Sequence, residues 1–298
     1  MGTADRDYFR DEDARYAARG GRPPLPPVTR FLLIANIAIF VIDFLTREGR
    51  QEFGIINREF CFRIETAFKE WRLWELITFQ FLHHGILHIA FNCVGIYFFG
   101  PWVERWWGTR RFIVFYLLCG VAGALFFTLL AKVGILPYED VPLVGASAGI
   151  YGLIIGTAVI APNALVSLLI PPVTLAMRTF AWWVIGIAVV FVVGGFFFGA
   201  ENFQNSGGEA GHLGGAILGF ILMRFPFLLG KGVSSKIIRP KEFRRKSAPK
   251  LRPRSEIDVV SSSEVDRILD KINREGLQSL TEREQEILQK ASKSKDDL

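Results

Sequence analysis

One serine in the chain lies in an unusual setting. Ser147 is surrounded by small residues in the segment GASAGIYG (residues 145–152), and an apolar run follows it to Ala161. In an apolar helix, a serine hydroxyl either hydrogen-bonds to its own backbone or acts as a nucleophile. A nucleophilic serine needs a base beside it, and the candidates are the four histidines of the chain, His83, His84, His88 and His212.

The sequence favours His212 as that base. It is followed by Gly215 and Gly219, and the i, i+3, i+7 spacing puts all three on one helix face. Small residues let membrane helices approach closely, and the segment around Ser147 is glycine-rich as well. If the two helices pack through these faces, the serine hydroxyl comes within hydrogen-bond reach of the imidazole. Tyr151, one turn below the serine, would then pack against the imidazole and hold its orientation.

Two further residues could donate hydrogen bonds to a developing oxyanion. His88 and Asn92 are four residues apart, so they share one face of a helix. Together with the backbone N–H of Ser147 they could stabilise negative charge on a carbonyl oxygen, where one such donor contributes about 3 kcal/mol. No Asp or Glu is obviously placed to orient His212, so the sequence predicts a catalytic unit of two residues.

Each of these residues also has an interpretation without chemistry. Ser147 could bond to a carbonyl of its own helix, a histidine at a helix start could be a cap, and Asn92 could join two helices. His84 and His88 are spaced i, i+4 and could bind a metal, but no carboxylate or thiolate joins them, so neither a metal nor another cofactor is expected. The joint occurrence of these residues with His212, at matching depth in their helices, favours catalysis.

The surrounding chain has the composition of a multi-pass membrane protein. Half of its 298 residues are hydrophobic, 21% are charged and the mean hydropathy is +0.29. A helix needs about 20 apolar residues to cross roughly 30 Å of hydrocarbon. The apolar runs predict six such helices, at residues 29–46, 84–102, 112–133, 145–162, 179–198 and 210–229. We therefore expect an all-α membrane protein with a six-helix transmembrane bundle.

Lysine and arginine residues indicate the orientation of the bundle. Residues 231–254 are densely basic and are expected in the cytoplasm, whereas residues 199–209 contain neither Lys nor Arg and are expected outside. Six spans with both termini inside satisfy this pattern. The loop 47–83 carries Lys and Arg although it is placed outside, but long loops follow the rule poorly. Residues 164–176 are interrupted by two prolines and are expected to form an interfacial connection instead of a seventh span.

The net charge of +6 does not require a nucleic-acid partner. Most of the basic excess lies next to the membrane, where anionic lipid headgroups are its expected partners. The three cysteines, Cys61, Cys93 and Cys119, are scattered, so neither a disulfide framework nor a thiolate metal site is indicated. Residues 1–27 lack the apolar core of a signal peptide, so the first membrane helix is expected to be the insertion signal.

Three motifs, in this order, resemble the rhomboid family of intramembrane serine proteases. They are LHIAFN (residues 87–92), the serine segment with Gly145, Ser147, Tyr151 and Gly152, and HLGGAILG (residues 212–219). Glu104, Arg105 and Gly108 also match the family's pattern after the second span. The resemblance covers about residues 29–230, or some two thirds of the chain.

The resemblance implies a role for each candidate residue. It implies Ser147 as the nucleophile, His212 as the general base, and an oxyanion site from His88, Asn92 and the backbone near the serine, with Gly145 shaping that loop. It also implies cleavage of single-span membrane proteins near the outer face, at small residues where the substrate helix unwinds easily. We therefore expect a multi-pass protein of the bacterial plasma membrane, with single-span proteins as substrates and membrane lipids around it.

Two positions depart from the family's pattern. Ala148 follows the serine, where many members have glycine, and this could alter local backbone freedom but not the nucleophile. Before the second span many members have Trp-Arg, whereas this chain has Trp74-Glu75, with Trp71-Arg72 three residues earlier. The anchoring of the first outer loop is therefore expected to differ.

The chain divides into four predicted parts: a cytosolic segment 1–28, the protease domain 29–230, a basic linker 231–254 and a cytosolic tail 255–298. In the tail, residues 261–264 and 281–284 are typical capping boxes that open amphipathic helices. They predict a small helical hairpin with a break at Gly276. The partner of this hairpin cannot be identified from its residues.

Two other functions compete with proteolysis. A non-catalytic rhomboid-like protein would bind and escort membrane clients, but such relatives typically lack the serine or the histidine, and this chain has both. A transporter or channel would need polar residues along a continuous path, whereas the polar groups of this chain stop at one depth. The sequence therefore favours intramembrane serine proteolysis.

Overall fold

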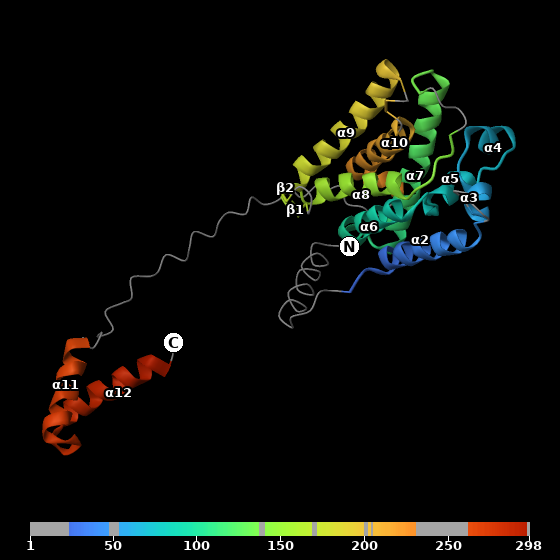
Figure 1. Cartoon of the computed structure of the whole chain (residues 1–298). Helices are drawn as coiled ribbons and strands as arrows, with labels where there is room; N and C mark the ends of the chain where they lie inside the picture. The colour runs from blue at the N-terminus through green and yellow to red at the C-terminus, as the bar shows by residue number, and fades with distance from the viewer. Residues whose placement is uncertain are drawn as a thin grey trace. The chain divides into compact units, whose positions relative to one another are not determined.

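The fold is mostly helical, as the sequence predicts. The computed structural model describes residues 24–47, 54–136, 141–168, 172–199, 202–203, 205–230 and 262–296. The chain forms two compact units, Met1–Ser235 and Lys236–Leu298 (Figure 1). Most of the predicted segment 1–28 and all of the predicted linker 231–254 lie outside the described residues.

Within its described residues, the first unit contains six long helices. They are α2 (Pro27–Leu45), α6 (Ile86–Trp107), α7 (Thr109–Lys132), α8 (Ser147–Ile160), α9 (Met177–Phe198) and α10 (Ser206–Arg224). The shorter helices are α3 (Ile55–Phe60), α4 (Ile64–Lys69), α5 (Glu75–Thr78), η1 (Phe79–Phe81) and η2 (Pro226–Leu229). The long helices coincide with the predicted spans, with ends displaced by at most five residues.

Length and composition separate the six long helices into two groups. Among the described residues, α2, α6, α7 and α9 are long and apolar enough to cross a membrane. α8 has 14 residues and is about 21 Å long, which is shorter than the roughly 30 Å of hydrocarbon. α10 has 19 residues and includes Glu209 and His212. The helices that bear Ser147 and His212 therefore differ from the other four.

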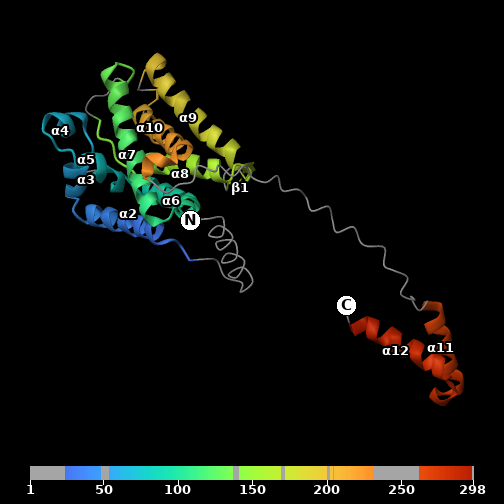
Figure 2. The same cartoon turned by 180° about the vertical axis from the view of Figure 1, so that it is seen from behind.

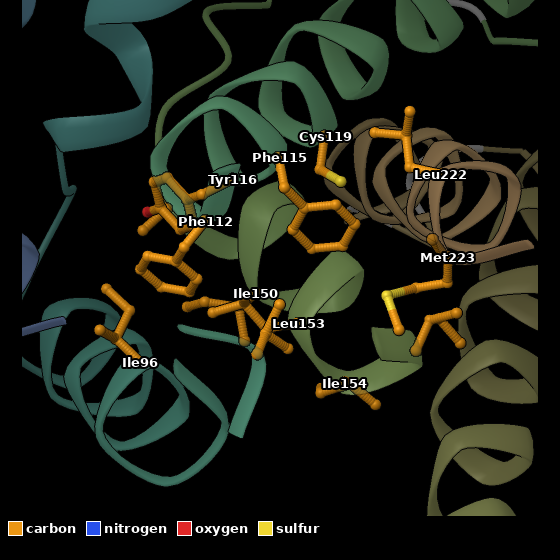
Figure 3. Close-up of a cluster of buried hydrophobic side chains, with 14 of the residues drawn as sticks. Ile96, Phe112, Phe115, Tyr116, Cys119, Ile150, Leu153, Ile154, Leu222 and Met223 are labelled. Atoms are coloured by element: carbon orange, nitrogen blue, oxygen red, sulfur yellow. The ribbon is translucent and has the colours of Figure 1, made fainter. Parts of the chain in front are cut away.

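The helices α8 and α10 pack at the centre of the first unit. α10 contacts α7, α8 and α9, and α8 contacts α6 and α7 (Figures 1 and 2). Figure 3 shows buried side chains of these helices meeting, with Phe115 and Cys119 from α7, Leu153 from α8 and Met223 from α10. Lipid tails are as apolar as these side chains, so close packing is what holds such helices together.

Two glycines of α10 allow its close approach to α8. A Cβ on Gly215 would overlap the backbone carbonyl oxygen of Ala148, and a Cβ on Gly219 would lie 2.8 Å from the Cα of Gly152. On α7, the Sγ of Cys119 lies 2.5 Å from the position that a Cβ on Gly152 would take. The glycine face expected from the i, i+3, i+7 spacing is therefore the face that meets α8.

A buried carboxylate joins the start of α2 to α6. Glu104 accepts hydrogen bonds from the backbone N–H groups of Val28 (2.9 Å) and Thr29 (2.7 Å) and from the Thr29 hydroxyl (2.7 Å). The N–H groups in the first turn of a helix have no carbonyl partner within it, and the helix dipole favours negative charge there. Glu104 is 2% exposed, so these bonds fix the two helices to each other inside the fold.

A second buried carboxylate anchors the segment between α2 and α6. Glu75 accepts hydrogen bonds from the Thr66 hydroxyl (2.7 Å) and the Arg63 backbone N–H (3.2 Å), and the Arg72 Nε lies 3.2 Å from it. A buried carboxylate needs such donors because it has lost its hydration. Glu75, which departs from the rhomboid pattern, is therefore an anchor of this loop.

The same loop holds the residues that lead into α8. Phe62 and Leu143 form an antiparallel bridge, and the backbone N–H of Gly145 donates to the carbonyl of Phe79 (2.9 Å). These backbone bonds fix the chain immediately before Ser147. The position of the serine is thus set from both sides, by the loop before it and by helix packing after it.

The connection between α8 and α9 contains two short strands. β1 (Leu165–Ser167) pairs antiparallel with β2 (Thr174–Ala176), and Val166 lies opposite Leu175. The predicted all-α fold therefore includes a small β element at residues 164–176. The interfacial location of this connection stays a prediction, and residues 169–171 lie outside the described part of the chain.

The second unit contains α11 (Ser262–Glu275), η3 (Leu277–Ser279) and α12 (Glu282–Asp296). Glu284 accepts the backbone N–H of Thr281 (2.9 Å), as the predicted capping box requires, and pairs with the Lys271 Nζ of α11 (2.9 Å). The Thr281 N–H and then Lys271 hold the pKa of Glu284 at about 2. The other predicted capping box begins at Ser261, outside the described residues.

Candidate active site

Ser147 and His212 meet between α8 and α10. Ser147 is the first residue of α8, and its Oγ lies 2.7 Å from the Nε2 of His212. The Tyr151 ring stacks on the imidazole, with ring centroids 4.3 Å apart and an angle of 18° between the planes. The structure therefore brings together the three side chains that the sequence analysis grouped. An imidazole nitrogen at this distance can accept the hydroxyl proton and make the oxygen a nucleophile.

Gly145 and His88 lie beside the serine. Gly145 has φ +126°, a conformation that residues with a Cβ rarely adopt. A Cβ at this position would lie 2.8 Å from the His88 Nε2 and 3.4 Å from the Ser147 Oγ. The missing side chain therefore leaves space next to both the His88 ring of α6 and the serine hydroxyl.

Asn92 follows His88 by one turn of α6 and carries a buried, unused donor. The residue is 5% exposed, and its Nδ2 has no hydrogen-bond partner within the described ranges. A buried amide without a partner costs about 1–3 kcal/mol, so such groups are rare in native structures. The Asn92 Nδ2 is therefore a buried donor without an acceptor among the described residues.

A further histidine packs against this group. His83, which precedes α6, is buried, and its ring centroid lies 5.0 Å from that of His88. Burial, with a smaller contribution from His88, lowers the pKa of His83 to about 3, so this ring is neutral at physiological pH. Across the described residues, no group of three or more His, Cys, Asp or Glu side chains is arranged to hold a metal ion.

The structure adds a carboxylate that the sequence analysis missed. Glu209 Oε2 lies 2.8 Å from the Nδ1 of His212, so the expectation that no Asp or Glu faces this imidazole is wrong. The same oxygen accepts the Tyr151 hydroxyl (3.3 Å), and the other accepts the Asn205 amide (3.2 Å).

The omission of Glu209 has a physical reason. The predicted sixth span begins at residue 210, which leaves Glu209 in a loop, whereas α10 begins at Ser206 and includes it. Inside a helix, the i, i+3 spacing from Glu209 to His212 puts both side chains on one face. The i, i+3 spacing could therefore have identified Glu209, but the predicted helix start at residue 210 left Glu209 outside the helix.

Comparison with known proteins assigns the chain to a family. The family described as the Rhomboid domain matches residues 70–227, which is just over half of the chain and includes Ser147, Glu209 and His212. The chain belongs to the rhomboid family. This rhomboid is an integral membrane protein, in agreement with its long apolar helices, and the resemblance inferred from the three motifs is confirmed.

Curated relatives of this rhomboid include proteases and a protein named as inactive. "Rhomboid protease GluP" of Bacillus subtilis (strain 168) is 34% identical over 151 residues, or 51% of this chain and 25% of that protein. "Putative rhomboid protease YdcA" of the same organism is 36% identical over 96 residues, or 31% of this chain and 42% of that protein. "Inactive RHOMBOID-like protein 8" of Arabidopsis thaliana is 30% identical over 82 residues, or 28% of this chain and 21% of that protein. This rhomboid thus matches less than half the length of each of them.

The second unit of this rhomboid has a match of its own. Residues 259–294 match a family of unknown function, DUF6576, and this range contains nearly all of α11 and α12. The match falls within the second compact unit, Lys236–Leu298. Two separate families therefore describe the two units of the chain.

Proposed function

We propose that this chain is an intramembrane serine endopeptidase, which hydrolyses peptide bonds within the transmembrane segments of membrane proteins. The observation that carries the proposal is the 2.7 Å contact between the Ser147 Oγ and the His212 Nε2. A hydroxyl and a base at this distance are what nucleophilic acyl transfer requires. Membership of a family with named proteases supports the same reaction.

The proposed reaction passes through an acyl ester on Ser147. Its hydroxyl gives the proton to the His212 Nε2 while its oxygen attacks the carbonyl carbon, and the π electrons move to the carbonyl oxygen. His212 then gives this proton to the leaving amine as the C–N bond breaks. Water attacks the ester, again with His212 as the base, and restores the serine hydroxyl. These steps need no cofactor.

The transient oxyanion is assigned to donors from α6 and from the start of α8. The Asn92 amide is buried and lacks a partner among the described residues, and the His88 Nε2 lies beside Gly145, as does the serine hydroxyl. The backbone at Ser147 completes the set. Each donor of this kind contributes about 3 kcal/mol to the transition state because it is already oriented in a site of low dielectric.

The proposal includes a topology and a domain organisation. All six long helices cross the membrane, with both termini in the cytoplasm, as the distribution of Lys and Arg favours. The protease domain is 29–230, between a cytosolic segment 1–28 and a basic linker 231–254 that meets anionic lipids, and the tail 255–298 is a cytosolic hairpin. Relatives from Bacillus subtilis support a bacterial plasma membrane as the location.

Single-span membrane proteins are the proposed substrates. A helical peptide bond is shielded by the hydrogen bonds of its own helix, so it must be unwound before a serine can reach it. Glycine and other residues of low helix propensity make that unwinding less costly. We therefore expect cleavage at small residues near the outer end of a substrate helix.

A relative named as inactive makes a client-binding rhomboid the second candidate. A fluorophosphonate, which reacts with activated serines, separates the two functions. The wild-type chain in detergent should be labelled, Ser147→Ala and His212→Ala should not be, and Ser167→Ala, which changes an exposed serine of β1, should react like the wild type.

Cleavage of purified single-span proteins completes the test. The wild type should cut some of them within the transmembrane segment, and Ser147→Ala should cut none. A wild-type chain that binds these proteins, but neither reacts with the probe nor cuts them, would establish the client-binding function instead.

A further inference from the structure

Glu209 is the group in the site that the two-residue reaction does not use. It is 8% exposed, and its partners are three side chains, those of His212 at 2.8 Å, Asn205 at 3.2 Å and Tyr151 at 3.3 Å. It lies in the first turn of α10, where the helix dipole favours negative charge. The surroundings therefore suit an ionised carboxylate that accepts hydrogen bonds from all three neighbours.

The charge of this carboxylate determines which nitrogen of His212 carries the proton. An ionised carboxylate is only an acceptor, so the Nδ1 that faces Glu209 must be the protonated nitrogen of the neutral ring. The Nε2 then keeps its lone pair, and this lone pair faces the Ser147 hydroxyl at 2.7 Å. In the opposite tautomer, a hydrogen on Nε2 would point at the serine, and the ring could not accept its proton.

We propose that Glu209 is a positioning residue that holds His212 in its productive tautomer and stabilises the imidazolium that forms when Ser147 loses its proton. This inference rests on the proposed protease function and extends the catalytic unit from two residues to three. Glu209 acts through the imidazole, since its closest contact at the site is the Nδ1, on the side of the ring away from the serine.

Tyr151 and Asn205 hold the carboxylate in place. Tyr151 stacks on the His212 ring and also donates its hydroxyl to the Glu209 Oε2, so one residue fixes the plane of the imidazole and the position of its partner. Asn205, at the N-terminal boundary of α10, donates to the other carboxylate oxygen. At metal sites, groups that orient a ligating histidine in this way matter by about 10–100-fold, and we use this range as the guide for His212.

Kinetics of the full-length chain in detergent provide the first test. Loss of the corresponding carboxylate in soluble serine proteases lowers kcat by about 10⁴-fold, because the histidine adopts the wrong tautomer. Tyr151 still holds the ring here, so we expect Glu209→Ala to lower kcat by about 100-fold or more while KM changes by less than about threefold. Glu209→Gln should lower kcat at least as much as Glu209→Ala, since its uncharged amide can donate to the Nδ1 and so favour the tautomer that carries its hydrogen on Nε2.

Two other variants calibrate this result. Tyr151→Phe keeps the stacked ring and removes only the hydroxyl bond to Glu209, so it should lower kcat by about 3- to 10-fold. Glu65→Gln removes an exposed carboxylate of α4 that pairs with Lys69, and it should leave the rate unchanged. If Glu209→Ala folds poorly, Tyr151→Phe and Glu209→Gln still test the role of the carboxylate.

The ¹⁵N spectrum of histidine provides a test that does not depend on cleavage. The chain has four histidines, and a His212→Ala sample identifies the signals of the ring in question. The wild type should show a protonated Nδ1 and an unprotonated Nε2, and Glu209→Ala should move part of the population to the opposite tautomer. A merely structural glutamate would change the melting temperature without changing the tautomer.

The outcomes separate this inference from the proposed function. If the wild type neither reacts with fluorophosphonate nor cuts any substrate, the protease function fails, and the spectrum alone still decides whether Glu209 sets the tautomer. If the wild type is active but Glu209→Ala retains kcat within threefold, or its His212 spectrum equals that of the wild type, the role of Glu209 is overturned and the two-residue reaction stands.

Discussion

Two junctions in this rhomboid each contain a buried carboxylate, and the two carboxylates have different partners. At the junction of α2 and α6, Glu104 accepts hydrogen bonds from two backbone N–H groups and the Thr29 hydroxyl. At the junction of α8 and α10, Glu209 accepts them from three side chains, one of which is the His212 imidazole. The first set consists of main-chain groups and one hydroxyl, whereas the second includes the imidazole that contacts the Ser147 hydroxyl.

The difference indicates how burial alone should be interpreted. Both carboxylates are less than 10% exposed, so exposure does not distinguish a structural group from a functional one. Backbone donors satisfy the buried carboxylate Glu104 and thereby hold two helices against each other. An imidazole as donor couples the carboxylate to a proton that moves. Variants that change one junction and spare the other test this distinction.

The largest effect is expected from the serine itself. Ser147→Ala should lower kcat by about 10⁴-fold or more, because the nucleophile is lost. The melting temperature should stay within about 2 °C of the wild type, since the hydroxyl contributes little to packing. The measurement is cleavage of a single-span substrate beside a thermal melt. Residual cleavage above one hundredth of the wild-type rate would place the nucleophile elsewhere.

Separating α8 from α10 should abolish activity as well. Gly215→Leu places a side chain where the Ala148 carbonyl oxygen lies, so the two helices must move apart and the contact between Ser147 and His212 is lost. Gly186→Ala is the matched control, because a Cβ at that glycine of α9 meets open space. Undiminished labelling of Gly215→Leu by a fluorophosphonate would show that this packing does not position the site.

The oxyanion donor should have a smaller effect that spares the fold. Asn92→Ala removes the donor without adding a charge, so kcat should fall by about 10²- to 10³-fold. Because the Nδ2 has no partner among the described residues, the substitution breaks no bond at this atom. A melting temperature lowered as strongly as kcat would instead identify Asn92 as a residue that joins helices.

The junction of α2 and α6 should show the opposite pattern. Glu104→Ala leaves the N–H groups of Val28 and Thr29 without their partner and should lower the free energy of unfolding by about 1–3 kcal/mol. The kcat of the fraction that remains folded should be unchanged. Loss of kcat at full thermal stability would contradict the structural role of Glu104.

The smallest effect on catalysis is expected from the second unit. The pKa of Glu284 is lowered from its ordinary value of 4.5 to about 2, first by the Thr281 N–H and then by Lys271. A lowered pKa means that the ionised form stabilises the fold, so this contribution is present above about pH 4.5 and is lost as the pH falls towards 2. NMR titration of Glu284 checks this, and Lys271→Ala should raise its midpoint.

Removal of residues 255–298 should leave cleavage in detergent largely intact.

The sequence predicted the helices and the central contact for identifiable reasons. Apolar runs of sufficient length located six helices, and the glycine spacing after His212 selected the face that meets α8. The ends of the helices were harder to predict from the sequence, because α10 begins within a polar, glycine-rich stretch that resembles a loop. Glu209 was missed for this reason alone. Periodicity locates the middle of a helix better than its first turn.

Other features depended on contacts that no local pattern encodes. The anchoring role of Glu75 arises from Thr66, Arg63 and Arg72, which a loop brings to it. The pairing of β1 with β2 joins residues across a connection with two prolines, where hydropathy alone indicated only an interruption. In both cases the chain path between distant residues, and not their spacing, creates the interaction.

The shortness of α8 has a consequence for where the chemistry takes place. With 14 residues it spans about 21 Å of a hydrocarbon layer that is roughly 30 Å thick. If its last turn reaches one boundary of that layer, the hydroxyl at its first residue lies about 9 Å beneath the other. If the proposed protease function holds, the thickness of the host bilayer would then select the substrate residue that arrives at the serine. Transfer into longer-chain lipids should shift the scissile bond along the same substrate.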